Sequence, residues 1–220
     1  MLHPKQFNRN YAQSLVSFVY RLNSIMNQLY PIFLKVHQLN ILLVGGGYVG
    51  TEKLEFLLKS SPRAQVTVVA REFRKEFLDL AAHSETVTLI EDAYHEKYLG
   101  GKHLVIAATD DKGVNRQIRD DAKERYLLVN VADTPDLCDF YLGGIVTKGN
   151  LKVAISTNGK SPTAAKRLRQ LLEEVLPEEM DELLENLHAY RDTLKGDFKQ
   201  KVKAMNEITQ TLILEKKESQ

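Results

Sequence analysis

Short apolar runs alternate with amphipathic segments between residues 40 and 133. The runs are rich in Val, Ile and Leu, which is typical of strands buried on both faces of a parallel sheet. The segments between them place apolar residues three or four positions apart, which predicts helices that pack one side on such a sheet. The predicted strands are 40–47, 64–70, 86–91, 103–110 and 126–133, and the predicted helices are 51–59, 72–82 and 113–125. This order predicts an α/β fold with a parallel sheet.

The pattern changes after Asp133. Residues 140–157 predict a β-hairpin with its turn at 148–150, where Gly and Asn tolerate positive φ angles. Ser161 and Pro162 are the residue types preferred at a helix N-cap and first helical position. Pro177 ends that helix, and two further helices follow. We therefore expect a small hairpin region and then a helical C-terminal region.

These patterns divide the chain into four predicted regions. They are an N-terminal extension at 1–25, a sheet domain at 26–140, a hairpin region at 141–176 and a helical region at 177–220. The polar residues within 1–25 argue against a signal peptide. Two interpretations of 1–25 stay open: an optional or mis-assigned extension before a true start at Met26, and a short amphipathic helix on the body.

Composition narrows the functional classes. The 30 basic and 29 acidic residues nearly cancel, which gives no support for a nucleic-acid partner or an anionic membrane surface. The apolar runs are far shorter than the roughly 20 residues that cross a bilayer. Cys138 is the one cysteine, so an internal disulfide and a cysteine metal cluster are excluded. We expect a cytoplasmic protein.

The stretch "GGGYVG" follows the first predicted strand and opens a helix. Gly45, Gly47 and Gly50 have the G-x-G-x-x-G spacing of Rossmann-type dinucleotide-binding domains. Gly45 allows the tight turn, Gly47 lets a pyrophosphate approach the backbone, and Gly50 lets the helix pack on the strand. Amides of Tyr48 and Val49 at the helix N-terminus would face the phosphates. A glycine turn without a ligand is the alternative.

Two more loops are predicted to meet this cofactor. Arg71 and Glu72 follow the second strand; an acid there favours the ribose hydroxyls of NAD and a basic residue favours NADP, and the pair favours NAD. Thr109, Asp110 and Asn115 follow the fourth strand, at the edge where such sheets bind ligands. The other interpretation of this loop is that Asp110 or Asp111 caps the next helix.

Five stretches, in order along the chain, resemble the siroheme-synthesis family, which comprises precorrin-2 dehydrogenases and the dehydrogenase/ferrochelatase part of siroheme synthase. The stretches are "LYPIFLKV" (29–36), "ILLVGGGYVGTEK" (41–53), "AATDDKGVN" (107–115), "VNVADTPDLCDF" (129–140) and "VAISTNGKSPTAAKRLR" (153–169). The chain departs from the family at "FYLGG", where many relatives have a proline, and at Gly50 and Thr51.

The resemblance implies an activity. Precorrin-2 would lose two electrons to become sirohydrochlorin, with NAD as the hydride acceptor, and some members also insert ferrous iron. Asp133 matches the acid of the family's N-V-x-D motif, which implies that it is the catalytic group, able to take the proton released during oxidation. A turn carboxylate that bonds its own backbone before Pro135 is the alternative.

The loop "STNGKSP" precedes a basic helix. Amides and polar side chains at a helix N-terminus suit carboxylates, and precorrin-2 carries many. The predicted substrate-binding residues are Ser156, Thr157, Asn158, Lys160, Lys166 and Arg167. An ordinary cap followed by a solvated basic face is the alternative.

The remaining expectations concern assembly, metals and rival functions. Unpaired hairpin strands carrying Ile145, Val153 and Ile155 need a partner, and the resemblance implies a homodimer formed there. The six histidines show no metal-ligand spacing, and His188 is a remote candidate to assist iron insertion. The rival functions are a nucleotide-sensing regulatory Rossmann module and a tetrapyrrole carrier without turnover.

Overall fold

A computed structural model describes residues 27 and 29–210. The predicted extension at 1–25 and the proposed start at Met26 lie outside the described residues. By its contacts the chain divides into Met1–Leu34 and Lys35–Gln220. The description below concerns the second unit.

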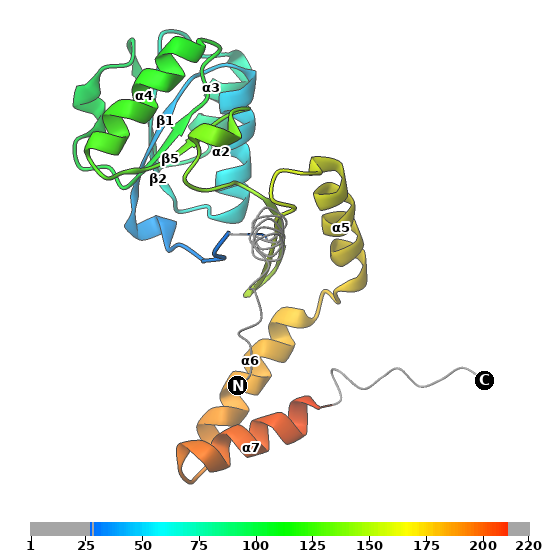
Figure 1. Ribbon diagram of the computed structural model, residues 1–220. Helices are drawn as coiled ribbons and strands as arrows, with labels where there is room; N and C mark the ends of the chain where they lie inside the picture. Colours follow the sequence, from blue (N-terminus) through cyan, green and yellow to red (C-terminus); the bar gives the residue numbers. More distant parts are fainter. Residues whose placement is uncertain (1–26, 28, 211–220) are drawn as a thin grey trace, which may run out of the picture. The chain divides into compact units, whose positions relative to one another are not determined.

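Five parallel strands form the central sheet (Figure 1). Their order is β3-β2-β1-β4-β5. Their bounds are β1 Asn40–Val44, β2 Gln65–Ala70, β3 Val87–Glu91, β4 Leu104–Ala107 and β5 Leu128–Val131. The order reverses between β1 and β4, which makes the gap beyond their carboxyl ends the place where sheets of this type bind ligands.

Helices cover both faces of the sheet. Alternate strand residues point to opposite faces, so Ile41 and Leu43 join one core cluster while Leu42 and Val44 join the other. The first cluster is covered by α2 (Tyr48–Ser60) and α3 (Lys75–Ala82), and the second by the 3-10 helix η2 (Glu96–Leu99) and α4 (Lys112–Glu124). The continuous apolar runs of the sequence therefore reflect burial on both faces.

The chain continues as a hairpin and three helices. Their bounds are β6 Gly144–Lys148, β7 Leu151–Ile155, α5 Pro162–Val175, α6 Met180–Thr193 and α7 Phe198–Thr209. Gly144 pairs with Ile155, and a Cβ on Gly144 would face Ala165 and Arg169 of α5. The hairpin face that carries Ile155 therefore packs on α5, while Ile145 lies on the opposite face.

The structure confirms the predicted fold class and the element order. Three strands stop earlier than predicted: β1 ends at Val44 instead of 47, β4 at Ala107 instead of 110, and β5 at Val131 instead of 133. β4 ends early because the Asn115 side chain bonds the hydroxyl and the carbonyl of Thr109. β5 ends early because Asp133 has a φ of 55°, a left-handed conformation that ends a strand. The four-region division stays a prediction.

Among the described residues, no helix combines the length and the apolar character needed to cross a membrane.

Candidate dinucleotide and substrate site

Three loops begin at the same level of the sheet, directly after the last residues of β1, β4 and β5. Val44, Ala107 and Val131 lie in register across β1, β4 and β5. The ladder extends one residue further, where the amides of Ala108 and Ala132 donate to Val44 and Ala107. The glycine loop and the segments after β4 and β5 therefore begin side by side at the carboxyl edge.

The three motif glycines have different surroundings. Gly45 has a φ of 123°, and a Cβ there would lie 2.3 Å from the carbonyl oxygen of Ala108. A Cβ on Gly50 would lie 2.1 Å from the carbonyl oxygen of Gly45. Around Gly47 a Cβ would meet nothing within 4 Å. Gly45 and Gly50 are thus required by packing, whereas Gly47 borders open space.

The N-terminus of α2 has no side-chain cap. The residue at its N-cap position is Gly47, which has no side chain, and the first turn of α2 contains no acidic residue. By contrast α4, α5 and α7 are capped by Asp111, Ser161 and Asp197. The first amides of a helix lack intrahelical partners and attract anions. The backbone of Tyr48 and its two successors is therefore available to a pyrophosphate.

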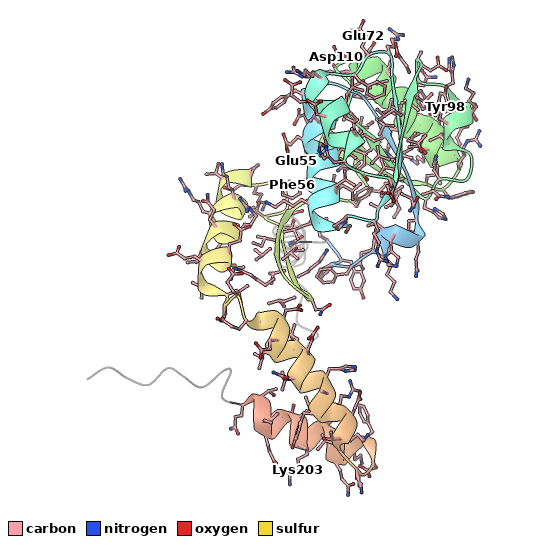
Figure 2. All side chains as sticks on the ribbon, turned by 180° about the vertical axis from the view of Figure 1, so that it is seen from behind. Glu55, Phe56, Glu72, Tyr98, Asp110 and Lys203 are labelled. Atoms are coloured by element: carbon pink, nitrogen blue, oxygen red, sulfur yellow. The ribbon has the colours of Figure 1, made fainter. Side chains whose placement is uncertain are left out.

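The first two side chains of α2 point to opposite sides, one to the core and one to solvent. Val49 packs on the core, while Tyr48 is 72% exposed beside the open space at Gly47. The loop after β2 abuts the glycine loop, since the amide of Arg74 donates to the carbonyl of Gly46 at 3.1 Å. Its Arg71 and Glu72 are exposed. Figure 2 shows Glu72 and Asp110 at the same end of the sheet domain.

Of the predicted ligand residues after β4, some bond other protein groups and one is exposed to solvent. Asp111, not Asp110, caps α4, accepting from the amides of Gly113 and Val114 at 2.7 and 3.1 Å. The Thr109 hydroxyl lies 2.7 Å from the Oδ1 of Asn115 and 3.0 Å from the carbonyl oxygen of Asp111, so both of its acceptors belong to the protein. Asp110 is exposed and has no role in the cap. Of the three predicted ligand residues of this loop, Asp110 is the exposed one.

Asp133 lies at the exposed tip of the loop after β5. The hydrogen bonds of this turn come from Thr134. Its amide donates to the carbonyl of Val131 at 3.3 Å, and its hydroxyl donates to the carbonyl of Ala132 at 3.3 Å. Among the described residues, the Asp133 carboxylate makes neither a hydrogen bond nor an ion pair. It does not show the backbone bond of an Asx turn, and it is open to a ligand.

Side chains of the segment after β5 bond the backbone groups along the outer edge of β5. The sequence did not predict these contacts. The Asp139 carboxylate accepts from the amide of Val129 at 3.0 Å and from Arg119 at 3.1 Å. The Cys138 thiol donates to the Val131 carbonyl at 3.2 Å. Burial raises the pKa of this thiol, which keeps it protonated and able to donate. These contacts hold the loop that carries Asp133.

A polar group after β3 was also not predicted. The Tyr98 hydroxyl donates to Asp92 and thereby lowers the pKa of that carboxyl. Tyr94 donates to Asp121 of α4 at 3.0 Å. Isolated tyrosines and acids in a sequence give no sign of such pairing. The group fastens the crossover between β3 and β4.

The loop before α5 is internally bonded. The Thr157 hydroxyl bonds the backbone of Ser161, and Ser156 accepts from the amide of Asn158 at 3.1 Å. Ser161 is the N-cap of α5, as predicted. Lys160 and Lys166 are exposed and carry no ion pair among the described residues, and Arg167 bonds only the neutral Gln170. This basic patch, defined as Lys160, Lys166 and Arg167, therefore keeps its charge for a ligand.

Among the described residues, no three His, Cys, Asp or Glu side chains are grouped to hold a metal ion. His188 is exposed on α6, 3.8 Å from Asp192.

The chain is a dinucleotide-binding protein of the Rossmann class by its sheet order, glycine loop and uncapped α2. A family model described as "Putative NAD(P)-binding" matches residues 32–144, just over half of the chain. The chain belongs to this NAD(P)-binding family. A second model, "Sirohaem biosynthesis protein central", matches residues 148–174.

Curated relatives carry the name siroheme synthase. One from Psychrobacter sp. (strain PRwf-1) is 37% identical over 76% of this chain and 34% of its own length. One from Psychromonas ingrahamii is 41% identical over 75% of this chain and 34% of its own. These matches confirm the resemblance to the siroheme-synthesis family. The chain spans about a third of the length of these relatives.

A solved structure titled "SirC, precorrin-2 dehydrogenase" superimposes with a TM-score of 0.67 at 24% identity, covering 84% of this chain and 93% of that one. This likeness confirms the fold, with its sheet domain, hairpin and C-terminal helices.

Proposed function

We propose that this protein is an NAD-dependent precorrin-2 dehydrogenase that forms sirohydrochlorin. The names of the siroheme synthase relatives and of the superimposed dehydrogenase support this proposal. The observation that carries it is the Asp133 carboxylate, exposed and without a hydrogen bond among the described residues, on a loop that leaves the sheet beside the cofactor loops.

The proposed reaction removes a hydride and a proton from the reduced tetrapyrrole. NAD, when bound, accepts the hydride. Asp133 accepts the proton as a general base. The uncapped α2 N-terminus holds the pyrophosphate through backbone amides, and the open space at Gly47 admits it. The protein thus orients the two reactants and supplies the base.

Cofactor choice rests on the loop after β2. Glu72 is exposed at the carboxyl edge and would accept from the ribose hydroxyls, which favours NAD. Arg71, its exposed neighbour, would tolerate the extra phosphate of NADP. We propose NAD as the main cofactor because a carboxylate repels that phosphate.

Substrate carboxylates would meet the basic patch. Lys160, Lys166 and Arg167 lie beside the N-terminus of α5, and none of them is paired with an acid among the described residues. Arg169 differs, because it pairs with Glu173. Charge-assisted hydrogen bonds to carboxylates are about twice as strong as neutral ones, so this patch suits precorrin-2. The match of residues 148–174 to the sirohaem biosynthesis central family supports the same assignment.

Assembly is proposed to be homodimeric. β6 and β7 form a two-stranded sheet whose outer edges are unpaired among the described residues, and an isolated hairpin is marginal in water. Leu168, Leu171 and Val175 of α5 are 46, 53 and 65% exposed at helical spacing. A second copy of the chain would cover both features. A cytoplasmic location remains a prediction from the cysteine content.

The test is direct. Purified protein is mixed with precorrin-2 and NAD, and the absorbance of sirohydrochlorin and NADH is followed, with and without ferrous iron. Equimolar formation of both products is expected. Tetrapyrrole binding without NADH would instead show a carrier, NAD binding without effect on precorrin-2 would show a sensing module, and siroheme formed only with iron would add the chelation step.

A further inference from the structure

We propose that Asn115 is a positioning residue of the dinucleotide site. The residue is 6% exposed, and its side chain bonds only Thr109 among the described residues. The Oδ1 of Asn115 accepts from the amide of Thr109 at 3.2 Å and from the Thr109 hydroxyl at 2.7 Å, and its Nδ2 donates to the Thr109 carbonyl at 2.9 Å. One side chain thus holds three polar groups of one residue.

These bonds leave little for a ligand. An asparagine amide offers two acceptor sites and two donors, and Thr109 takes both acceptor sites and one donor. The amide of Thr109 is occupied as well, so it is not available to a phosphate. Asn115 and Thr109 therefore act on the cofactor through the backbone they hold and not by direct contact.

The backbone that Asn115 and Thr109 hold is the segment against which the glycine loop packs. A Cβ on Gly45 would lie 2.3 Å from the carbonyl oxygen of Ala108 and 3.1 Å from the amide nitrogen of Thr109. The glycine turn therefore rests directly on this segment. Asp110 follows immediately and is exposed. A shift of Thr109 would displace the phosphate loop and Asp110 together.

The Thr109 hydroxyl also lies 3.0 Å from the carbonyl oxygen of Asp111, but the side-chain cap of α4 does not involve the Asn115 side chain. Asp111 caps that helix through the amides of Gly113 and Val114, so the helix keeps its cap without Asn115. The Asn115 side chain is thus not required to begin α4. Its distinct contribution is the geometry of the β4 end.

Asn130 supplies a matched control. It is the other buried polar residue among those described and is also 6% exposed. Its Nδ2 donates to the Phe140 carbonyl at 2.8 Å, which belongs to the segment after β5 and not to the β4 end. Asn115→Ala and Asn130→Ala remove the same group from equally buried places and differ in what the group holds.

The experiment measures the NAD dissociation constant by calorimetry and the melting temperature for both variants. We expect Asn115→Ala to weaken NAD binding by on the order of tenfold or more, since small misplacements of a site are costly, while Asn130→Ala keeps the wild-type affinity. Unchanged NAD affinity in Asn115→Ala, or an equal loss in both variants, would overturn the proposal. Turnover of precorrin-2 is not needed for this test.

Asn115→Asp adds a signature that a general loss of stability does not produce. Its carboxylate lacks the donor to the Thr109 carbonyl, whereas the protonated acid regains one. Burial favours the protonated form. We expect its NAD affinity to rise toward the wild-type value as the pH falls, with the wild type unchanged over the same range. If Asn115→Ala does not fold, this variant decides, and parallel pH profiles would refute the proposal.

Discussion

Gly50 and Gly45 meet backbone to backbone: a Cβ on Gly50 would lie 2.1 Å from the carbonyl oxygen of Gly45. The glycine loop and the first turn of α2 therefore form one packed unit. Gly47, between them, has nothing within 4 Å of the corresponding position. One motif thus contains two glycines that the fold requires and a third, Gly47, that packing does not require.

The first prediction separates these two kinds of glycine. Gly47→Asp should fold with a near wild-type melting temperature and lose NAD binding, because its side chain and charge would occupy the phosphate path. Gly50→Ala should be destabilised by about 1–3 kcal/mol, the usual cost of overpacking. Calorimetry with NAD and thermal unfolding check both. Retained NAD affinity in Gly47→Asp would place the pyrophosphate elsewhere.

The second prediction concerns the basic patch. Lys166→Ala with Arg167→Ala should raise the Michaelis constant for precorrin-2 and leave the NAD dissociation constant unchanged, because the two ligands use separate sites. Arg116→Ala with Lys123→Ala removes the same charge from exposed positions of α4 and is the control. Steady-state kinetics and calorimetry measure the two constants. A larger effect on NAD than on the tetrapyrrole would contradict the assignment.

The third prediction concerns assembly. The wild type should be a dimer at micromolar concentration by light scattering, because α5 exposes Leu171 and Val175 beside a hairpin whose edges are unpaired within residues 29–210. Leu171→Glu should shift the equilibrium toward monomer, since burying an unpaired charge is costly. Leu78→Glu on α3, where the leucine is 44% exposed, is the control and should stay dimeric. A monomeric wild type would refute the proposal.

The sheet and its glycine loop could be predicted because burial on both faces leaves continuous apolar runs, and G-x-G-x-x-G is a local pattern. The roles of Thr109 and Asn115 could not. Both are polar residues in the right loop, and only the fold shows that they bond each other instead of facing the crevice. Cys138 and Asp139 likewise replace a strand, which depends on contacts across the chain.

The fourth prediction uses the Cys138 thiol. Burial raises its pKa in the folded state, so it stabilises the fold fully below the unfolded thiol pKa of about 8.5, and this contribution is lost as the pH rises through the folded value. The free energy of unfolding should therefore fall more steeply above about pH 8.5 in the wild type than in Cys138→Ser. Chemical denaturation at several pH values measures this. Equal slopes would show that the thiol is not responsible.

The last prediction concerns Asp133. Asp133→Asn should fold normally and bind NAD, because Asn also tolerates the positive φ at this position. Its turnover of precorrin-2 should fall by about 10²–10⁴-fold, the usual contribution of a general base. Asp136→Asn, an exposed acid on the same loop, should keep wild-type turnover. Stopped-flow measurement of NADH formation at saturating precorrin-2 compares the three proteins.

The outcome also decides between two roles for the carboxylate. If Asp133 only shaped the turn, Asn would serve as well, and NADH formation would stay near the wild-type rate. In that case Asp110, an exposed acid at the same edge of the sheet, would be the next base to replace. If the protein also inserts ferrous iron, Asp133→Asn should slow that step too, because pyrrole protons must leave when the metal enters. A loss of both steps with NAD binding intact would assign both proton transfers to one carboxylate.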